Sequence, residues 1–135
     1  MIAWKTLLSV VSGAIVATGI GCDTEKVTSP GVGLEIHNTV DNFQYQVTDV
    51  RDYTHVDSFT WQNSGSTATV NQATTVTGGS VTLVLMDAAG VEVYSRSLTE
   101  NGTFASSAGV AGAWTVRLTY SHASATVNFR VQKAT

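Results

Sequence analysis

The sequence of 135 residues is poor in cysteine and proline, with a single residue of each, Cys22 and Pro30. One cysteine cannot form a disulfide within the chain, so a folded domain has to rely on its hydrophobic core. The residues after Pro30 contain no cysteine, which excludes thiol catalysis in that part of the chain. They also contain no Gly-x-Ser-x-Gly stretch, the motif that carries the nucleophile of α/β-hydrolases.

Charge is also scarce, since 13% of the residues are charged and the 7 basic and 10 acidic residues give a net charge of −3. The basic residues are scattered and form no stripe, which argues against nucleic acid as a partner on electrostatic grounds. The mildly acidic chain has no electrostatic attraction for anionic lipid either. No segment shows sustained 3.6-residue periodicity, so the sequence does not predict a helical domain.

The first 21 residues have the pattern of an export signal. Lys5 supplies one positive charge, residues 6–21 contain no charge, and the stretch ends in small residues. A helix that crosses a bilayer needs about 20 apolar residues, and this stretch is shorter and diluted by Ser, Thr and Gly. The first acidic residue of the chain, Asp23, follows directly after Cys22.

The junction Gly19-Ile20-Gly21-Cys22 resembles the lipobox of bacterial lipoproteins. The resemblance implies that the signal peptide, residues 1–21, is removed, that the Cys22 thiol carries a diacylglycerol, and that the new amino terminus is acylated. Lipidation also gives the lone thiol a role, because a free cysteine in an oxidising compartment is reactive. Two other interpretations stay open: cleavage before Ile20 by an ordinary signal peptidase, and retention of the segment as an uncleaved anchor.

Residues 22–33 form a polar stretch around Pro30, which predicts a short lipidated tether. The remaining residues, 34–135, are enough for one domain with its own core, and they are rich in Thr, Val, Ser, Ala and Gly. Apolar and polar residues alternate along this segment, as they do on strands with one buried and one solvent-facing side. The alternating runs are 34–37, 43–48, 59–61, 81–86, 91–93, 114–120 and 127–131.

Turn residues separate these runs, at 63–66, 77–80, 87–90, 101–102 and 121–124. Their spacing predicts an all-β domain, an antiparallel β-sandwich of seven to nine strands with an immunoglobulin-like or jelly-roll-like arrangement. Residues 85–94, a strand, an Asp-x-x-Gly turn and a strand, and residues 112–116, a Gly-x-Trp opening a late strand, resemble small immunoglobulin-like or GOLD-like sandwich modules of secreted proteins. This resemblance concerns the fold and implies no active site.

The densest polar patch is residues 49–57, which contains Asp49, Asp52 and Asp57 together with Arg51 and His55. Carboxylate oxygens and imidazole nitrogens are ligands for Ca²⁺ or a transition metal, so the three aspartates are candidate metal ligands. Their spacing matches no Ca²⁺-loop signature such as Asp-x-Asp-x-Asp-Gly. The alternative interpretation is the solvated end of a hairpin, with Arg51 neutralising a neighbouring carboxylate.

The aromatic residues divide into predicted core and predicted surface. Trp114 alternates with apolar neighbours and Trp61 shares a face with Phe59, which predicts that both indoles are buried. Tyr53 and Tyr94 are out of phase with the neighbouring apolar residues, so they are the candidate ligand-binding aromatics. The three histidines lie on separate segments and are expected to be exposed: His37, His55 and His122.

Taken as a whole, the sequence predicts a non-enzymatic binding or structural module that is held by lipid to a membrane of the bacterial envelope, facing the periplasm or the exterior. We expect no catalytic residue and no cofactor, and an envelope protein as the partner. The alternative is a carbohydrate-binding module on the cell surface, which would use exposed aromatics and a Ca²⁺ ion held by the 49–57 patch. A small hydrolase is a third hypothesis, and no motif in the sequence favours it.

Overall fold

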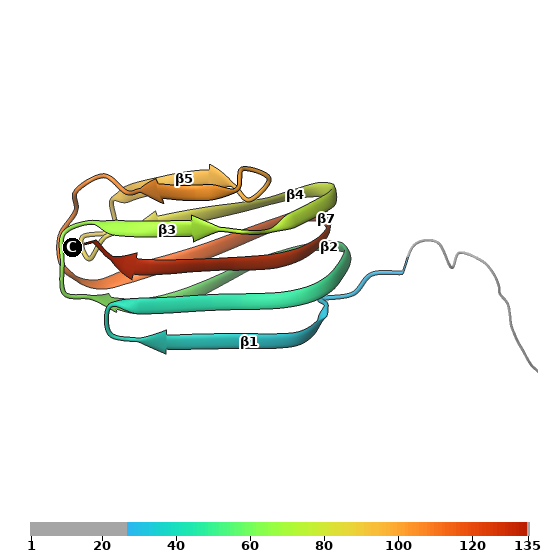
Figure 1. Ribbon diagram of the computed structural model, residues 1–135, viewed down its shortest axis with the longest axis horizontal. Coiled ribbons are helices and arrows are strands. Elements are labelled where there is room, and N and C mark those ends of the chain that lie inside the picture. Colours follow the sequence, from blue (N-terminus) through green and yellow to red (C-terminus); the bar gives the residue numbers. More distant parts are fainter. Residues whose placement is uncertain (1–26, 135) are drawn as a thin grey trace, which may run out of the picture.

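The computed structural model describes residues 27–134, and within them the chain is all β (Figure 1). Strands are the expected outcome for a segment of alternating Val, Thr, Tyr and Phe residues, and the predicted all-β antiparallel fold is confirmed. Within these residues, no helix has the length and apolar character needed to span a bilayer. The seven strands are β1 (Val32–Thr39), β2 (Asn42–Asn63), β3 (Ala68–Gln72), β4 (Thr75–Met86), β5 (Glu92–Ser97), β6 (Gly102–Ala105) and β7 (Gly112–Lys133).

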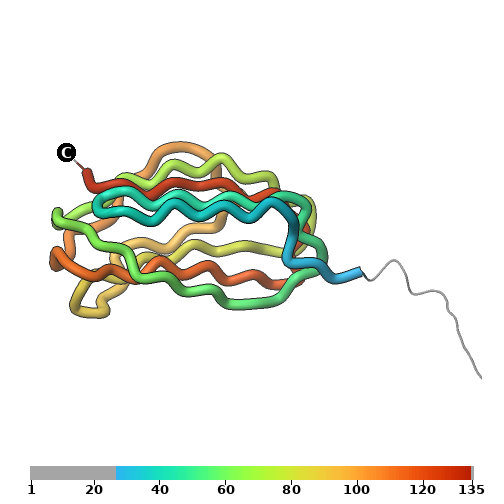
Figure 2. The backbone as a smooth tube through the Cα atoms, turned by 90° about the horizontal axis from the view of Figure 1, so that it is seen from below, coloured from blue at the N-terminus to red at the C-terminus, as the bar shows by residue number. Residues whose placement is uncertain are grey.

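Two long strands organise the fold, because β2 and β7 pair with each other along almost their whole lengths. Both bend midway, so one continuous antiparallel sheet folds over into two layers (Figure 2). The first layer contains β1, residues 42–50 of β2, residues 125–133 of β7, β3 and β6. The second layer contains residues 53–63 of β2, residues 112–121 of β7, most of β4, and β5.

The bend is built from irregular residues in three neighbouring strands. In β2 the register with β7 shifts three times between Val47 and His55, and Asp49 and Asp52 have positive φ angles of 61° and 42°. In β7, His122 has φ 45°, and in β4, Gly79 has φ 63°. Bulges of this kind add a residue on one strand and turn it sharply, which is how a single strand passes from one layer to the other.

The bend corrects three predictions. Residues 77–80 and 121–124 were expected to be turns between strands, and they lie inside the continuous strands β4 and β7. Residues 49–57 were considered as a hairpin end, and they lie inside β2. Glycine and short polar residues tolerate positive φ in a turn and in a bulge alike, so the local chemistry does not distinguish the two.

The core lies between the two layers and follows the predicted alternation. Trp61 and Trp114 are fully buried, as predicted, and their rings meet edge to face with centroids 5.9 Å apart. Each indole N–H donates to a backbone carbonyl, Trp61 to Thr39 at 3.1 Å and Trp114 to Val110 at 2.8 Å. The two largest side chains of the core therefore leave no unpaired donor behind.

A pair of tyrosine hydroxyls joins the layers inside this core. Tyr45 of the first layer and Tyr120 of the second are hydrogen-bonded through their hydroxyl oxygens at 2.7 Å. The Tyr45 ring stacks on Phe129, with centroids 5.4 Å apart. Burial raises the pKa of both phenols, so the pair stays neutral and each hydroxyl keeps its proton.

The predicted turn at residues 87–90 is confirmed, and its Asp87 does more than start the turn. Gly90 N–H donates to the Asp87 carbonyl at 2.9 Å, with Gly90 at φ 81°. The Asp87 carboxylate accepts from the N–H groups of Ala89, Val91 and Val110, at 3.0, 2.9 and 2.9 Å. One nearly buried side chain therefore holds the β4–β5 turn against the loop that precedes β7.

This carboxylate makes the fold sensitive to acid. The N–H groups of Val110 and Val91 hold the pKa of Asp87 below its usual value of 3.8, so the folded state binds the proton less well than the unfolded state. The stabilisation is therefore complete above about pH 5 and is lost as the pH falls through the folded-state pKa. We expect the melting temperature to drop by several degrees between about pH 5 and about pH 3. Asp87→Asn should melt lower at pH 7 and lose part of this drop, whereas Glu92→Gln, at an exposed position of β5, should keep all of it.

Candidate functional site

The predicted polar patch lies at the bend, and each of its carboxylates has its own partner. Arg51 forms a two-pronged pair with Asp49, with Nη2 and Nε at 2.8 and 3.0 Å from the two carboxylate oxygens. The pair lowers the pKa of Asp49 and raises that of Arg51, and both side chains are more than half exposed. An exposed pair of this kind contributes little to stability.

The other two aspartates pair with histidines on different parts of the sheet. Asp52 lies 3.1 Å from Nδ1 of His122, across the bend from β2 to β7. Asp57 lies 3.1 Å from Nε2 of His55, further along β2. The three candidate metal ligands therefore do not converge on one point. Within residues 27–134, no three His, Cys, Asp or Glu side chains form a group that could hold a metal ion.

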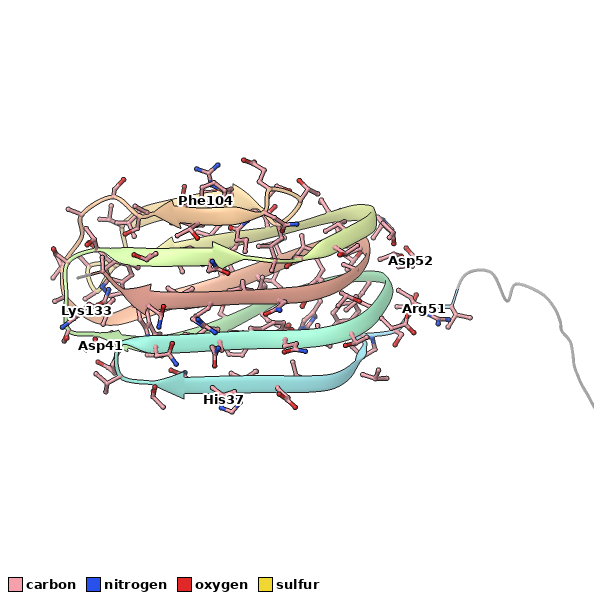
Figure 3. The ribbon with its side chains drawn as sticks, viewed as in Figure 1. His37, Asp41, Arg51, Asp52, Phe104 and Lys133 are labelled. Carbon is pink, nitrogen blue, oxygen red and sulfur yellow. The ribbon has the colours of Figure 1, made fainter. Side chains whose placement is uncertain are left out.

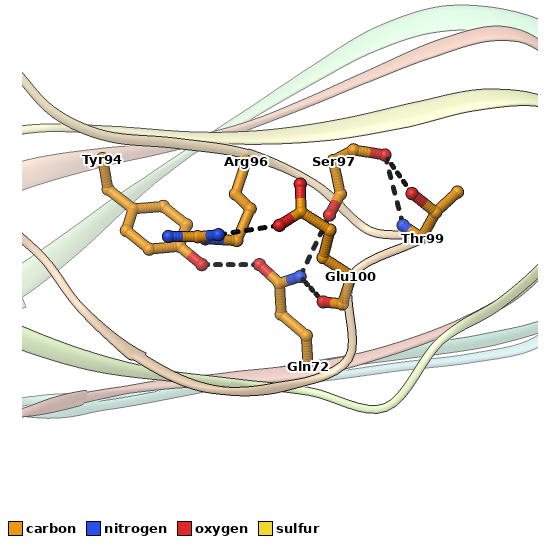
Figure 4. Close-up of polar contacts among 6 residues, drawn as sticks. All are labelled: Gln72, Tyr94, Arg96, Ser97, Thr99 and Glu100. Atoms are coloured by element: carbon orange, nitrogen blue, oxygen red, sulfur yellow. Dashed lines mark hydrogen bonds and ion pairs between the residues drawn. The ribbon is translucent and has the colours of Figure 1, made fainter.

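The two candidate ligand-binding tyrosines are not a pair of surface aromatics. Tyr53 is half-buried and packs edge to face on Tyr120, with centroids 5.1 Å apart. Tyr94 is only 6% exposed, and its hydroxyl donates to the Gln72 amide oxygen at 2.6 Å (Figure 4). The prediction that Tyr94 lies free at the surface is therefore wrong. The register between β4 and β5 shifts beside Tyr94, between Leu85 and Met86, so burial does not follow a simple alternation there.

Gln72 completes a buried polar network around Tyr94. Its amide nitrogen donates to the carbonyls of Ser97 and Glu100, which ties β3 to the connection between β5 and β6 (Figure 4). Outside this network, the Arg96 guanidinium lies 3.9 Å from the ring centroid of Phe104 and 2.8 Å from Glu100. These contacts tie β3 to β5 and to the β5–β6 connection. The polar groups of the Tyr94 and Gln72 side chains are all hydrogen-bonded within the network.

A serine, a lysine and an aspartate meet at the end of the molecule opposite the bend (Figure 3). The Asp41 carboxylate accepts from Ser64 N–H at 2.7 Å and from Ser64 Oγ at 2.8 Å, and Lys133 Nζ lies 3.3 Å from Ser64 Oγ. The hydrogen bonds from Ser64 lower the pKa of Asp41. The trio joins three chain segments at this end of the molecule: the β1–β2 turn, the β2–β3 connection and the end of β7.

The bend also forms a shallow cavity of about 320 Å³, lined by six polar and two apolar residues. Arg51 and Asp49 contribute to it from β2, Thr75 and Thr77 from β4, and Ser124 from β7. These hydroxyl residues were not predicted as a site, because they are distant from Arg51 in the sequence: Thr75 and Thr77 follow it by 24 and 26 residues, and Ser124 by 73. The signal that could have found them is Gly79, since a glycine inside a strand marks a close approach of two backbones.

The chain that precedes β1 joins the domain at the same bend. Ser29 and Arg51 exchange two backbone hydrogen bonds, at 2.8 and 3.0 Å. Gly31, at φ 96°, lies against Val47 and Thr48, so only a residue without Cβ fits there. The predicted tether therefore enters at the bend end, and Cys22 lies outside the residues that the structure describes. Figure 1 shows this entry at one end of the sandwich and the end of β7 at the other.

The side of the sandwich formed by β1 is open. All eight residues of β1 are exposed, including Leu34 at 56% and Ile36 at 37%. The side chain of Asn38 donates to the Thr60 carbonyl of the second layer at 2.8 Å, which closes the layers at one end of β1 only. His37, which was predicted to be exposed, projects from this strand (Figure 3).

No protein-family model and no curated protein sequence matches the chain. The chain is similar to two solved structures of one protein, the capsular polysaccharide assembling protein CapF from Staphylococcus aureus. Each match has 10% sequence identity and a TM-score of 0.30. The matches cover 77% and 76% of this chain but only 30% and 31% of the CapF chains. The chain thus spans about a third of the length of those proteins, and a likeness with this TM-score carries no argument about function.

Proposed function

We propose that this chain is an envelope lipoprotein, in which lipid on Cys22 holds a non-enzymatic β-sandwich module at a bacterial membrane. The module binds or organises another envelope component. The leader pattern of residues 1–21 and the lipobox-like junction support the anchor. Each buried methylene contributes about 0.8 kcal/mol, so two or three acyl chains are enough for stable attachment without basic residues.

The observation that carries the proposal is the entry of the tether at the bend end. Ser29 is fixed to Arg51 there, so an anchored domain keeps its opposite end and the β1 side clear of the attachment point. Both of these surfaces expose apolar residues. Val40, Val91 and Val110, in the loops opposite the bend, are 65%, 58% and 54% exposed. Exposed loops and strand edges are the surfaces with which β-sandwiches usually bind their partners.

Replacement of Cys22 tests the anchor. We expect Cys22→Ser to abolish incorporation of radiolabelled palmitate and to move the protein from the membrane fraction to the soluble fraction of a bacterial host that processes lipoproteins. The matched control is Ser9→Ala, which changes the apolar segment but leaves the acylated position intact. A wild-type chain that starts at Ile20 would contradict the proposal in favour of ordinary secretion. A membrane-bound wild-type chain without palmitate would contradict it in favour of a retained anchor.

A carbohydrate-binding module is the second candidate, and the polar cavity at the bend favours it. Hydroxyl groups of Thr75, Thr77 and Ser124 beside the Arg51 guanidinium are groups that hydrogen-bond sugar hydroxyls. The burial of Tyr94 removes one of the two aromatic platforms that this hypothesis used, which leaves Tyr53. Binding to a glycan array that is lost in Arg51→Ala and Tyr53→Ala, and kept in Glu92→Gln, would support it over a protein partner.

A further inference from the structure

The outer edge of β1 has no partner strand among the residues that the structure describes. β1 pairs with β2 on its inner side, and it is the outermost ribbon on its side of the molecule (Figure 1). Natural proteins protect such edges with lysine or proline, because a free row of N–H and C=O groups pairs readily with another strand. β1 contains neither residue, and its one register shift lies between Val32 and Glu35, near its beginning.

The backbone hydrogen bonds between β2 and β7 show which residues of β2 bond toward β1. Lys133 N–H donates to the Asp41 carbonyl at 3.0 Å, so Asp41 bonds toward the β7 side. Backbone bonding alternates between the two sides along a strand, so Phe43 also bonds toward β7, and its pairing with Val131 agrees with this. The N–H and C=O groups of the residue between them, Asn42, therefore bond toward β1, and those of Gln44 do so too.

The same alternation places the free groups of β1. The partners of Asn42 and Gln44 are Thr39 and His37, so these two residues bond inward to β2. The N–H and C=O groups of Ile36 and Asn38 point outward. Those of Leu34 do so too, because Leu34 directly precedes the inward-bonding Glu35 and the positive φ of the register shift lies at Gly33. A strand that pairs with this edge must therefore bring its own outward-bonding residues opposite these three.

We propose that the occupant of this edge is β1 of a second copy of the chain. In an antiparallel pair with Ile36 opposite Ile36 on a two-fold axis, Leu34 lies opposite Asn38 in both halves. Each of these pairs joins outward-bonding residues, so the backbone groups of both edges are satisfied. The exposed side chains of Leu34 and Ile36 are brought together along the seam, where their apolar surface is removed from water.

Charge complementarity selects this register over its neighbours. With Ile36 on the axis, Glu35 lies opposite His37 of the second copy on both sides of the axis, in the pairs whose side chains approach most closely. An imidazole N–H can donate to the carboxylate there. A shift by one allowed step in either direction places Glu35 opposite Glu35, or His37 opposite His37. Only the register centred on Ile36 therefore pairs unlike groups.

The pairing is independent of lipidation, but it sets the position of the two tethers. Antiparallel strands point in opposite directions, so the bend ends, and with them the two Ser29–Arg51 junctions, lie at opposite ends of the dimer. Residues 22–28, which precede the fixed Ser29, can span at most about 25 Å. Two anchors in one membrane are therefore compatible with a dimer whose strands lie along the membrane surface.

Sedimentation equilibrium of the full chain in density-matched detergent tests the pairing, over roughly 1 to 100 μM protein. We expect a dimer for the wild type. His37→Glu places two carboxylates opposite each other twice per dimer and should raise the dissociation constant about tenfold or more. Glu35→Lys should weaken the dimer as well, and the double variant Glu35→Lys/His37→Glu should return to within about threefold of the wild type. Glu92→Lys, an exposed acidic position on β5, is the matched control and should leave the dimer unchanged.

Two results would overturn the inference. One is a wild-type chain that stays monomeric across the whole concentration range. The other is a dimer whose dissociation constant responds to the single variants at positions 35 and 37 no more than to Glu92→Lys, or is not recovered in the double variant. Because all three positions are exposed, an unchanged melting temperature in each variant separates loss of pairing from loss of folding.

Discussion

Gly79→Ala is expected to be the most destabilising single-methyl change in the described part of the chain. A Cβ at position 79 would lie well inside the 3.0 Å limit of real Cβ contacts from the carbonyl oxygens of Ser121 and His122. Those atoms belong to the backbone of β7 at its own bend, so neither can move without separating β4 from β7. The left-handed φ of 63° adds a further cost for any residue with a side chain. We expect a loss of about 4 kcal/mol or more in the free energy of unfolding, or failure to fold.

Gly90→Ala provides the matched control for this prediction. Gly90 also has a positive φ, 81°, but its Cβ would meet nothing within 4 Å. The alanine there should cost only the backbone term, about 1–2 kcal/mol. Urea unfolding followed by far-UV circular dichroism measures both variants. Equal losses at the two positions would show that the close approach at the bend does not limit the fold.

The strand faces could be predicted from the sequence because burial on a strand is a local, period-two property. Phe43, Tyr45 and Val47 are buried on one face, as their alternation indicated, and so are Trp114 and Val116. The face to which each of these side chains points can be predicted whatever strand lies beside them, because successive side chains of a strand point to opposite faces. The all-β class and the burial of both indoles therefore followed from the sequence alone.

The continuity of the long strands could not be predicted, because it depends on partners far away in the sequence. Asp49 and Asp52 look like the end of a hairpin, since short polar residues adopt positive φ in turns. Their N–H groups are instead satisfied by the hydroxyls of Thr126 and Ser124 on β7, at 3.4 and 3.2 Å. Only that long-range pairing makes the segment a bend within one strand.

The predicted exposure of Tyr94 was wrong for a related reason. Alternation assumes that one face of a strand is wet, and Val93 and Tyr94 are adjacent yet both 6% exposed. Tyr94 points to the core and meets Gln72, whereas Val93 is covered by the loop before β7, where Ser107 N–H donates to its carbonyl at 2.8 Å. A loop that folds back over a strand leaves no periodic signal in the strand that it covers.

The three aspartates of the polar patch are a further case in which distant partners in the sequence could not be predicted. Their closeness in sequence suggested a shared ligand, but β2 carries them past two different neighbours. Asp49 finds Arg51 two residues away, whereas the partner of Asp52, His122, is 70 residues away on β7. Charges on a strand that bends are distributed along its length and between its faces. Proximity in the sequence therefore says little about convergence in space.

Trp114→Ala is expected to remove about 3–5 kcal/mol from the free energy of unfolding. Trp114 is fully buried between the layers near the end opposite the bend, so truncation opens a large cavity, removes the edge contact with Trp61 and leaves the Val110 carbonyl without its indole donor. Trp114→Phe keeps most of the ring volume and should cost less, about 1–3 kcal/mol, through the smaller cavity and the lost indole hydrogen bond, since the Val110 carbonyl still accepts from Ala88 N–H at 3.2 Å. Val91→Ala, at a residue that is 58% exposed, should stay within about 0.5 kcal/mol of the wild type.

A double-mutant cycle with Trp61→Ala separates the ring contact from the cavity. The two rings are 5.9 Å apart at an interplanar angle of 87°, the edge-to-face geometry that aromatic pairs prefer. We expect a coupling of about 0.5–1.5 kcal/mol between the two positions, measured by urea unfolding of both single variants and the double variant. Strict additivity would mean that the indoles fill space independently. A loss below about 1 kcal/mol for Trp114→Ala would mean that the two layers do not close over this residue, because removal of an indole from a packed core costs about 3–5 kcal/mol.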